Sequence, residues 1–366
     1  MRLGKFGNMN YCGLFEHTYK GKKVLLTGHT GFKGTWMLIW LHQLGAIIKG
    51  YALAPEEGND FYTRIGGDSL CDSVIADIRD KDKLKAVIND FQPDFVFHLA
   101  AQPLVIRSYE EPLYTFDVNI MGTGYLLEAI RFLEKKCTIV VITTDKVYEN
   151  RETGQAYKED DKLGGYDPYS ASKAGAEIVV SSYRNSFFNS SKYKIHQKAI
   201  ASARAGNVIG GGDWSKNRII PDIIRGIERG EDVIVRNPVS VRPWQFVLEP
   251  LGGYLLLGAR LNDEPVKFAD AWNFGPHTDD VMNVRQVVEQ AISIYGKGKY
   301  VMPPIIGQPH EAGLLNLDIG KSVSELAWQP KLRTAGAIEY TIDWYKLSAP
   351  EYYNFTLGQI QKYANK

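Results

Sequence analysis

The first half of the chain alternates short apolar runs with segments of helical periodicity. Four runs are predicted to be buried strands: residues 23–27, 47–52, 95–100 and 138–143. Three segments between them are predicted to be helices: residues 35–44, 82–90 and 114–133. Strands that alternate with helices indicate a parallel sheet with helices on both faces, so we expect an α/β fold with a Rossmann-like, doubly wound sheet.

The alternation weakens after about residue 205, where three consecutive glycines (210–212) and several prolines occur. Residues 271–274 are predicted to return to the main sheet as a strand. We therefore expect a Rossmann domain over residues 21–204 with return segments near 240–275, and a smaller, mixed α/β lobe for substrate from 205–239 and 276–366. Residues 1–20 lack clear periodicity, which predicts an N-terminal extension outside the fold, with a short docked segment as the alternative.

Composition excludes several classes of partner. A formal net charge of +1 gives no reason to expect nucleic acid or an anionic membrane. The longest apolar stretches fall short of the roughly 20 residues that a membrane span needs. Cys12, Cys71 and Cys137 are widely spaced, with no Cys/His cluster for a metal. We expect a cytoplasmic protein with reduced cysteines, no metal, and neither nucleic acid nor membrane as partner.

A glycine-rich turn follows the first predicted strand and precedes a helix. Its spacing is Gly28-x-x-Gly31-x-x-Gly34, which differs from the common G-x-G-x-x-G fingerprint. In this position, glycines let backbone N–H groups approach a pyrophosphate at the helix N-terminus. The turn therefore predicts a dinucleotide site with contacts from the following residues: Gly28, Thr30, Gly31, Phe32, Lys33 and Gly34.

Other cofactor contacts are expected at later strand ends. Residues 49–53 offer neither the acid expected for NAD nor an arginine for NADP, so NAD is the prediction and NADP stays open. Asp77, before Ile78, could accept a hydrogen bond from an adenine amine or could simply cap a helix. The small residues after the third predicted strand would let the cofactor pass close to the backbone: Leu99, Ala100, Ala101 and Gln102.

Tyr169 and Lys173 are four residues apart, which places them on one face of a helix. Asp167 can cap this helix and Pro168 suits its first turn. A nearby cation favours tyrosinate, so the phenol could act as a base below its usual pKa of roughly 10. A surface tyrosine beside a solvated lysine is the alternative, but the nucleotide-binding half upstream favours oxidation of an alcohol.

Thr144-Asp145-Lys146 follows the apolar run 138–143. Thr143 or Thr144 could hydrogen-bond the reacting hydroxyl. Asp145 and Lys146 add an acid and an amine that simple alcohol oxidation does not need. The triplet therefore indicates a second chemical step.

Several motifs occur in the order that is typical of one known protein family, and the resemblance to that family covers about residues 20–350. They are the segments 27–34, 144–150 (Thr-Asp-Lys-Val-Tyr-Glu-Asn), 204–214 (Arg-Ala-Gly-Asn-Val-Ile-Gly-Gly-Gly-Asp-Trp) and 241–245 (Val-Arg-Pro-Trp-Gln). The chain resembles the extended short-chain dehydrogenase/reductases that act on nucleotide sugars. Among them it is similar to the CDP-glucose 4,6-dehydratases.

The resemblance implies a lyase that uses NAD to oxidise C4 of CDP-glucose, eliminates water across C5–C6 and returns the hydride to C6. Tyr169 would be the base, Lys173 would bind the nicotinamide ribose, and Asp145 would protonate the departing C6 hydroxyl. Lys146 stands where related dTDP-glucose dehydratases carry a glutamate. It could act as a neutral base, stabilise the enolate, or form an ordinary salt bridge. The nucleobase, and a product destined for surface polysaccharide, rest on the resemblance alone.

Further roles are implied for residues outside the triplet. Asn119 would steady the active-site helix region, Asn207 would contact sugar or diphosphate, and Arg218 and Arg242 would neutralise the diphosphate. Trp214 and Trp244 could wall the nucleotide or pack in the core. A homodimer or homotetramer is expected. The alternatives are an epimerase, a dehydratase for another nucleotide sugar, and a non-catalytic dinucleotide sensor.

Overall fold

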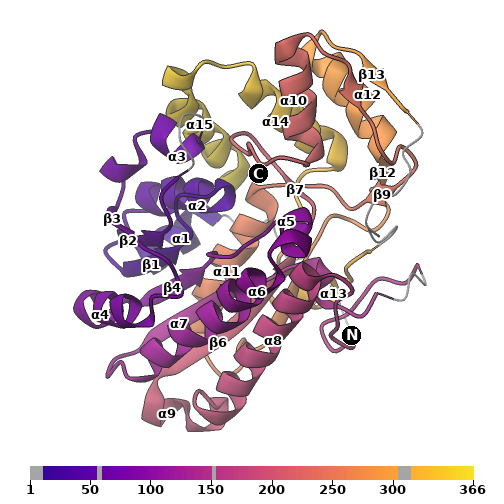
Figure 1. Ribbon diagram of the computed structural model, residues 1–366. Coiled ribbons are helices and arrows are strands. Elements are labelled where there is room, and N and C mark those ends of the chain that lie inside the picture. The colour runs from indigo at the N-terminus through magenta and orange to yellow at the C-terminus, as the bar shows by residue number, and fades with distance from the viewer. Residues whose placement is uncertain (1–10, 56–59, 151–153, 304–314) are drawn as a thin grey trace, which may run out of the picture.

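The computed structural model describes residues 11–55, 60–150, 154–303 and 315–366. Its centre is a seven-stranded parallel sheet (Figure 1) of order β11-β6-β5-β4-β1-β2-β3. The strands are β1 Lys23–Thr27, β2 Ile47–Ala52, β3 Asp72–Ile75, β4 Phe95–His98, β5 Cys137–Ile142, β6 Lys198–Ala205 and β11 Ala271–Phe274. The order reverses between β1 and β4, as in a doubly wound sheet. The predicted fold class and the return of residues 271–274 to the sheet are confirmed.

Side chains of the buried strands alternate between two apolar cores. In β1, Val24 and Leu26 face one core and Leu25 faces the other. The first core is covered by α2 (Phe32–Gln43) and α11 (Leu248–Asp263), and the second by α4 (Lys81–Phe91), α7 (Gly122–Arg131) and α8 (Pro168–Ser186). Both faces of the sheet are therefore buried, which explains why its strands are almost continuously apolar.

The helix predicted over residues 114–133 is interrupted. It consists of α6 (Pro112–Phe116), a π-helical turn η2 (Asp117–Met121) and α7. Such turns occur frequently at functional sites, because the extra residue turns side chains to new directions. Here the turn carries Asn119, which is 2% exposed.

The N-terminal prediction was wrong for residues 11–19. They form helix α1 (Tyr11–Tyr19), whose Phe15 and Tyr19 are fully buried. The Tyr19 hydroxyl donates to the Leu255 carbonyl oxygen of α11 at 2.5 Å. The docked-segment alternative therefore holds for this stretch, while residues 1–10 lie outside the described residues.

The second half of the chain adds a lobe beside the carboxyl edge of the sheet (Figure 1). Its longer helices are α10 (Ile219–Arg229), α12 (Val284–Tyr295), α14 (Thr334–Tyr345) and α15 (Tyr352–Ala364). Among its described residues, three small strand pairs are formed by β7 (Val208–Ile209) with β10 (Gln245–Phe246), β8 (Val233–Ile234) with β13 (Tyr300–Val301), and β9 (Val241–Arg242) with β12 (Met282–Asn283). The remaining short helices are α3 (Phe61–Arg64), η1 (Gly67–Ser69), α5 (Val105–Glu110), η3 (Asp145–Val147), η4 (Ser190–Lys192), α9 (Tyr193–His196), α13 (Gly320–Glu325) and η5 (Ala349–Glu351).

The last helix does not belong to the lobe alone. On α15, Tyr363 packs edge-on against Trp40 of α2, with ring centroids 6.0 Å apart, and its hydroxyl donates to Glu249 of α11 at 2.7 Å. The proposed domain boundaries remain a prediction, but α15 joins the sheet domain to the lobe. Within the described ranges, none of the helices combines the length and apolarity needed to cross a bilayer.

Candidate active site

A cavity of about 750 Å³ lies where residues following β5 and β6 meet the lobe. Ligands of doubly wound sheets bind at this edge, outside the carboxyl ends of the strands. The cavity lining includes most of the residues predicted for the reacting centre and the substrate, but neither Lys173 nor most of the predicted cofactor contacts. The predicted residues that line it are Phe32, Lys33, Thr143, Thr144, Asp145, Lys146, Tyr169, Asn207, Arg218 and Arg242. Segments more than two hundred residues apart in the sequence thus share one site.

Asp145 is a buried acid of this cavity, with 2% of its surface exposed, and Asp213, which pairs with Arg218, is the other among its described lining residues. The Oδ1 of Asp145 accepts a hydrogen bond from Thr144 Oγ1 at 2.9 Å, and its Oδ2 accepts one from Asn207 Nδ2 at 3.1 Å. Gly206 is required beside it, since a Cβ there would lie 2.0 Å from the Asp145 Cγ atom. Asn207 adopts a left-handed backbone (φ 50°), which asparagine tolerates better than most residues. The chain around residue 206 is therefore shaped to enclose this carboxyl group.

Tyr169 lies at the start of α8 as predicted, with Asp167 accepting from the Ser170 backbone N–H at 2.9 Å. Lys173 is 7% exposed, and its Nζ donates to the Ile142 carbonyl oxygen at 3.1 Å. The expected lowering of the tyrosine pKa was wrong for this structure. Burial raises the pKa of Tyr169 to about 12 and Asp145 adds to this effect, although a hydrogen bond from Thr144 opposes it. Burial also lowers the pKa of Lys173 to about 8, against the opposing charge of Glu177.

Lys33 brings a second amine to the same cavity. Its Nζ lies 5.7 Å from the ring centroid of Tyr254. Burial, followed by the charges of Lys173 and Arg218, lowers the pKa of Lys33 to about 7, while Asp145 opposes the shift. The turn motif predicted Lys33 only as a cofactor contact, and its titration near neutral pH could not be read from spacing.

The glycine turn fits the phosphates of a dinucleotide. Gly28 has a φ of +76°, and a Cβ on it would lie 2.7 Å from the Ala100 nitrogen. A Cβ on Gly34 would lie 1.9 Å from the Gly28 carbonyl oxygen, so neither position accepts a side chain. Gly31 is the N-cap of α2, whose first backbone N–H groups have no helical partner. The Thr30 hydroxyl instead donates to the Leu53 carbonyl oxygen at 3.0 Å, which ties the turn to the end of β2.

Asp77 and Ile78 follow β3 at the same edge of the sheet. The Asp77 carboxylate pairs with Arg79 at 2.7 Å, and Ile78 is 5% exposed. Asp80, and not Asp77, caps α4, so the helix-capping alternative was wrong. Arg79 is held by Asp77 and, at 3.5 Å, by Asp117.

Asn119 connects the strand-end loop to α8. Its Oδ1 accepts from the Gln102 backbone N–H at 2.8 Å, and its Nδ2 donates to the Ser172 Oγ at 2.8 Å and to the Gln102 carbonyl oxygen at 3.1 Å. On the other side of this loop, the Ala100 backbone N–H donates to Thr27 Oγ1 at 3.2 Å. The side chain of Asn119 thereby fixes α8, and with it Tyr169, relative to the loop after β4.

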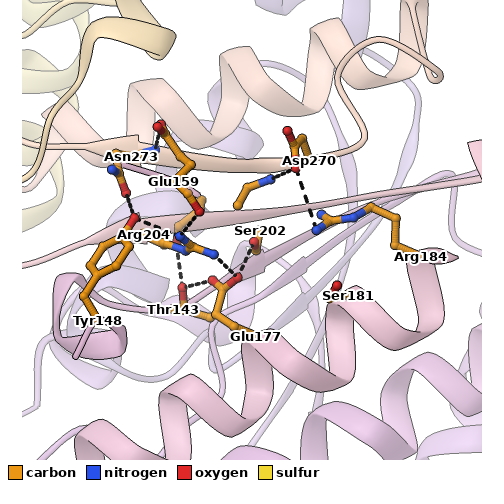
Figure 2. A network of polar contacts seen from close by, with 12 residues as sticks. Thr143, Tyr148, Glu159, Glu177, Ser181, Arg184, Ser202, Arg204, Asp270 and Asn273 are labelled. Carbon is orange, nitrogen blue, oxygen red and sulfur yellow. Dashed lines mark hydrogen bonds and ion pairs between the residues drawn. The ribbon is translucent and has the colours of Figure 1, made fainter. Parts of the chain in front are cut away.

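A buried polar network lies behind the reacting centre (Figure 2) and was missed by sequence reasoning. Glu177 and Arg204 form an ion pair at 2.9 Å, with exposed fractions of only 2% and 4%. Glu177 also accepts from Thr143 Oγ1 at 2.5 Å, and Arg204 donates to the Tyr148 hydroxyl at 2.8 Å. The Thr143 hydroxyl therefore belongs to this network, whereas the Thr144 hydroxyl donates to Asp145.

Only some of the other residues predicted to bind substrate line the cavity. Arg218 pairs with Asp213 at 2.8 Å within the cavity wall. The placement of Trp214 against the nucleotide was wrong, because its ring packs edge-on against Tyr345 at 5.2 Å and is absent from the cavity lining. Trp244 lines the cavity instead. A polar group from the lobe and from α5 that sequence reasoning missed lines it too: Arg107, Arg236, Asn237 and Ser240.

The doubly wound sheet, the glycine turn and the Tyr169–Lys173 pair define an extended short-chain dehydrogenase/reductase. The model of the GDP-mannose 4,6 dehydratase family matches residues 25–341, and the chain belongs to that family. The chain is 46% identical over 331 residues to a CDP-glucose 4,6-dehydratase of Salmonella typhimurium, covering 90% of this chain and 92% of the relative.

Solved structures agree on the fold. A UDP-glucose 4-epimerase from Thermus thermophilus in complex with NAD has a TM-score of 0.74 at 24% identity, covering 88% of this chain and 99% of the other. A dTDP-glucose 4,6-dehydratase from Bacillus anthracis in complex with NAD has a TM-score of 0.73 at 21% identity, covering 89% and 97%. Across the described ranges, no three His, Cys, Asp or Glu side chains group as a metal site would require.

Proposed function

We propose that the protein converts CDP-glucose to CDP-4-keto-6-deoxyglucose and water, with NAD regenerated in each cycle. The observation that carries this proposal is the buried Asp145, which lines the same cavity as Tyr169 and accepts a hydrogen bond from Thr144. Oxidation alone has no use for a buried acid, whereas loss of a hydroxyl group needs a proton donor. The 46% identity to a CDP-glucose 4,6-dehydratase supports cytosine as the nucleobase of the substrate.

Bound NAD would supply the hydride acceptor at C4 and the donor at C6. Its pyrophosphate would lie on the turn from Gly28 to Gly34, and Asp77 and Ile78 would face the adenine. Lys173 would hold the nicotinamide ribose, near Asn119 and the Leu99–Gln102 loop. The pairing of Arg79 with two carboxylates supports NAD, because an arginine that binds the 2′-phosphate of NADP would need to be available.

The protein's own groups would handle the protons. The Tyr169 phenol oxygen would receive the C4 hydroxyl proton, and Asp145 would protonate the departing C6 hydroxyl. Asn207 would orient Asp145, while Arg218 and Arg242 would bind the diphosphate. Trp244 would take the wall position predicted for Trp214.

The group that takes the C5 proton has two candidates in the cavity, Lys146 and Lys33. Burial lowers the pKa of Lys33 to about 7, so part of its amine is neutral near pH 7 and can accept a proton. Comparing Lys33→Met with Lys146→Met in D2O separates them. The variant that still oxidises C4 but no longer incorporates solvent deuterium at C5 lacks the base.

Incubation with NAD and a panel of CDP-, dTDP-, GDP- and UDP-glucose tests the proposed function. We expect a product lighter by one water from CDP-glucose, with a 4-ketone that borodeuteride reduction labels. A product of unchanged mass with inverted C4 would indicate an epimerase. Dehydration of another member of the panel in preference to CDP-glucose would overturn the cytidine assignment.

A homo-oligomer and a cytoplasmic location stay predictions. The helices α6, η2 and α8 expose large apolar side chains, with Leu113 80%, Met121 46% and Ile178 60% exposed. Burial of such residues against a second copy would stabilise a dimer. Light scattering of the protein and of Ile178→Asp tests this, since a monomer at all concentrations would contradict it.

A further inference from the structure

The turn that carries Asp145 and Lys146 is held only weakly by its own hydrogen bonds. This turn, η3, follows Thr144, and the Val147 backbone N–H lies 3.4 Å from the Thr144 carbonyl oxygen. The Lys146 backbone N–H lies 3.4 Å from the Thr144 Oγ1 atom. Both distances exceed the roughly 2.9–3.0 Å that is usual for N–H···O bonds. The position of Asp145 in the cavity therefore depends largely on the residues that flank the turn.

Both flanks of the turn are tied to one buried ion pair (Figure 2). On the N-terminal side, Thr143 Oγ1 donates to Glu177 Oε1 at 2.5 Å. On the C-terminal side, the Tyr148 hydroxyl accepts from Arg204 Nη1 at 2.8 Å and donates to Asn273 Oδ1 at 2.7 Å. Arg204 Nη2 and Glu177 Oε2 join the two sides at 2.9 Å. We call Thr143, Glu177, Arg204 and Tyr148 the clamp.

The clamp connects the turn to the elements that carry the other residues of the reacting centre. Glu177 lies on α8, about two turns beyond Tyr169. Arg204 lies near the end of β6, and the chain continues from there to Asn207, whose Nδ2 donates to Asp145 Oδ2 at 3.1 Å. The ion pair therefore sets how the turn with Asp145 lies relative to the helix with Tyr169.

The chemistry of the clamp suits a positioning role and no direct role in the reaction. Thr143, Ser202 and Arg204 all donate to Glu177, so its carboxylate form is the one that satisfies every partner. Burial acts to raise the pKa of Glu177, but Arg204 and these hydrogen bonds hold it below its ordinary value. Glu177, Arg204 and Tyr148 are absent from the described residues that line the cavity. They neither touch the substrate space nor offer it a proton.

We propose that the Glu177–Arg204 pair acts through Thr143 and Tyr148 to position Asp145 for the elimination step. This inference rests on the proposed dehydratase function. Tyr169 is fixed separately, because Asn119 Nδ2 holds α8 through Ser172 Oγ at 2.8 Å. Cutting one flank of the turn should therefore displace Asp145 while Tyr169 stays in place. A displacement of about 1 Å can slow a chemical step about 10²-fold, so elimination should slow and C4 oxidation should not.

Two variants cut the clamp at opposite ends. Tyr148→Phe removes the C-terminal link and keeps the ring, while Thr143→Val removes the N-terminal link at nearly constant size. Thr143→Ser keeps the hydroxyl and should restore the behaviour of the unaltered protein. Tyr19→Phe is the matched control, because it also removes a buried hydroxyl, one that donates to the Leu255 carbonyl oxygen.

A single turnover of the NAD-loaded protein with CDP-glucose measures the effect. Borodeuteride traps the ketones, and mass spectrometry separates the undehydrated 4-ketohexose from the 4-keto-6-deoxy product. We expect Tyr148→Phe and Thr143→Val to accumulate the undehydrated ketone, with elimination slowed about 10- to 100-fold and total ketone formed at nearly the unaltered rate. Thr143→Ser and Tyr19→Phe should show no accumulation.

Hydrogen exchange without ligands gives a reading that does not depend on activity. Tyr148→Phe should speed exchange of the backbone amides of residues 144–148 relative to those of β4, because local opening of the turn becomes easier. Tyr19→Phe should leave this ratio unchanged, since any loss of global stability affects both segments.

Three results would overturn the positioning role. They are an unchanged ratio of the two ketones in Tyr148→Phe and Thr143→Val, an equal slowing of oxidation and elimination, and accumulation of undehydrated ketone by Tyr19→Phe. An unchanged exchange ratio in Tyr148→Phe would also contradict it. Failure of the unaltered protein to dehydrate CDP-glucose would instead remove the proposed function, and the exchange ratio would still test whether the clamp holds the turn.

Discussion

Two groups of buried ionisable residues include side chains of α8, and they differ in whether a partner of opposite charge compensates each charge. In the network, Glu177 and Arg204 lie 2.9 Å apart. Burial acts to raise the pKa of Glu177, but Arg204 and hydrogen bonds from Thr143 and Ser202 outweigh it and hold the pKa below its ordinary value. The charged forms are thus stabilised in place.

The cavity group, which combines Tyr169 and Lys173 of α8 with Lys33 of α2, shows the opposite pattern. Burial lowers the pKa of Lys33 to about 7 and of Lys173 to about 8, and raises that of Tyr169 to about 12. Each group is displaced toward its neutral form, because its charge is not fully compensated by a partner. The comparison indicates that the network provides rigid support, while the cavity group is arranged to move protons. Perturbed groups of this kind are typical of active sites.

The largest effect is expected from Tyr169→Phe, which removes the phenol oxygen from the reacting centre. Loss of a general base should lower kcat by about 10³-fold while the fold remains intact. Initial rates with CDP-glucose and NAD measure this. Tyr254→Phe is the matched control, since Tyr254 is also buried but its hydroxyl has no hydrogen-bond partner among the described residues. Equal losses in both variants would contradict a special role for Tyr169.

Arg204→Met should mainly destabilise the protein. It leaves the Glu177 carboxylate buried without its cation, which costs about 3–5 kcal/mol of unfolding free energy. Urea unfolding measures the change, and adding Glu177→Gln should recover part of it. Arg285→Met is the control, because the Arg285–Glu289 pair is 53% and 42% exposed and should leave the unfolding midpoint unchanged. If Arg204→Met were as stable as the unaltered protein, the claim that the network stabilises its charged forms, unlike the cavity group, would be wrong.

Arg242→Ala should affect binding and leave stability unchanged. Arg242 lines the cavity, and loss of a charge-assisted hydrogen bond to a diphosphate should raise KM for CDP-glucose about 10-fold with kcat little changed. Trp214→Phe should leave KM unchanged, since Trp214 packs against Tyr345 outside the cavity lining. If KM rose in Trp214→Phe and not in Arg242→Ala, Trp214 and not Arg242 would be the residue that binds the substrate.

Lys33→Met should increase stability near neutral pH. The pKa of Lys33 is about 7 in the folded protein against an ordinary 10.5, so the unfolded chain binds more protons in this window. Stability from this group therefore rises with pH between these values, and methionine removes the dependence. At a pH near 7, Lys33→Met should have a higher free energy of unfolding in urea than the unaltered protein, and this difference should shrink as the pH rises through 10.5. The exposed Lys162→Met should show no such convergence.

Local patterns predicted the parts of the fold that depend on neighbouring residues. Four of the five strands up to residue 143, the helix start at Asp167-Pro168 and the return strand at residues 271–274 follow from periodicity and capping, whereas the short, half-exposed β3 was missed. Helix α1 was missed because it is short and is stabilised by burial of Phe15 and Tyr19 against distant segments. Periodicity within nine residues carries little of that information.

In the site, too, the features that depend on neighbouring residues were predicted and those that depend on distant segments were not. The spacing of Tyr169 and Lys173, and the Thr144-Asp145-Lys146 triplet, placed the reacting centre, and most of its predicted residues line one cavity. The sign of the Tyr169 pKa shift was wrong, because it depends on total burial and not on one lysine. Glu177 meets Arg204 from another element, so their pairing has no local signal, although Glu177 lies one turn beyond Lys173 on the same helix.

The most direct test of the dehydratase cycle follows a deuterium atom placed at C4 of CDP-glucose. The protein is incubated with this substrate and NAD, and the product sugar is analysed by mass spectrometry and NMR. Our account predicts loss of one water and transfer of the deuterium from C4 to C6. A product of unchanged mass that keeps the deuterium at an inverted C4 would contradict it.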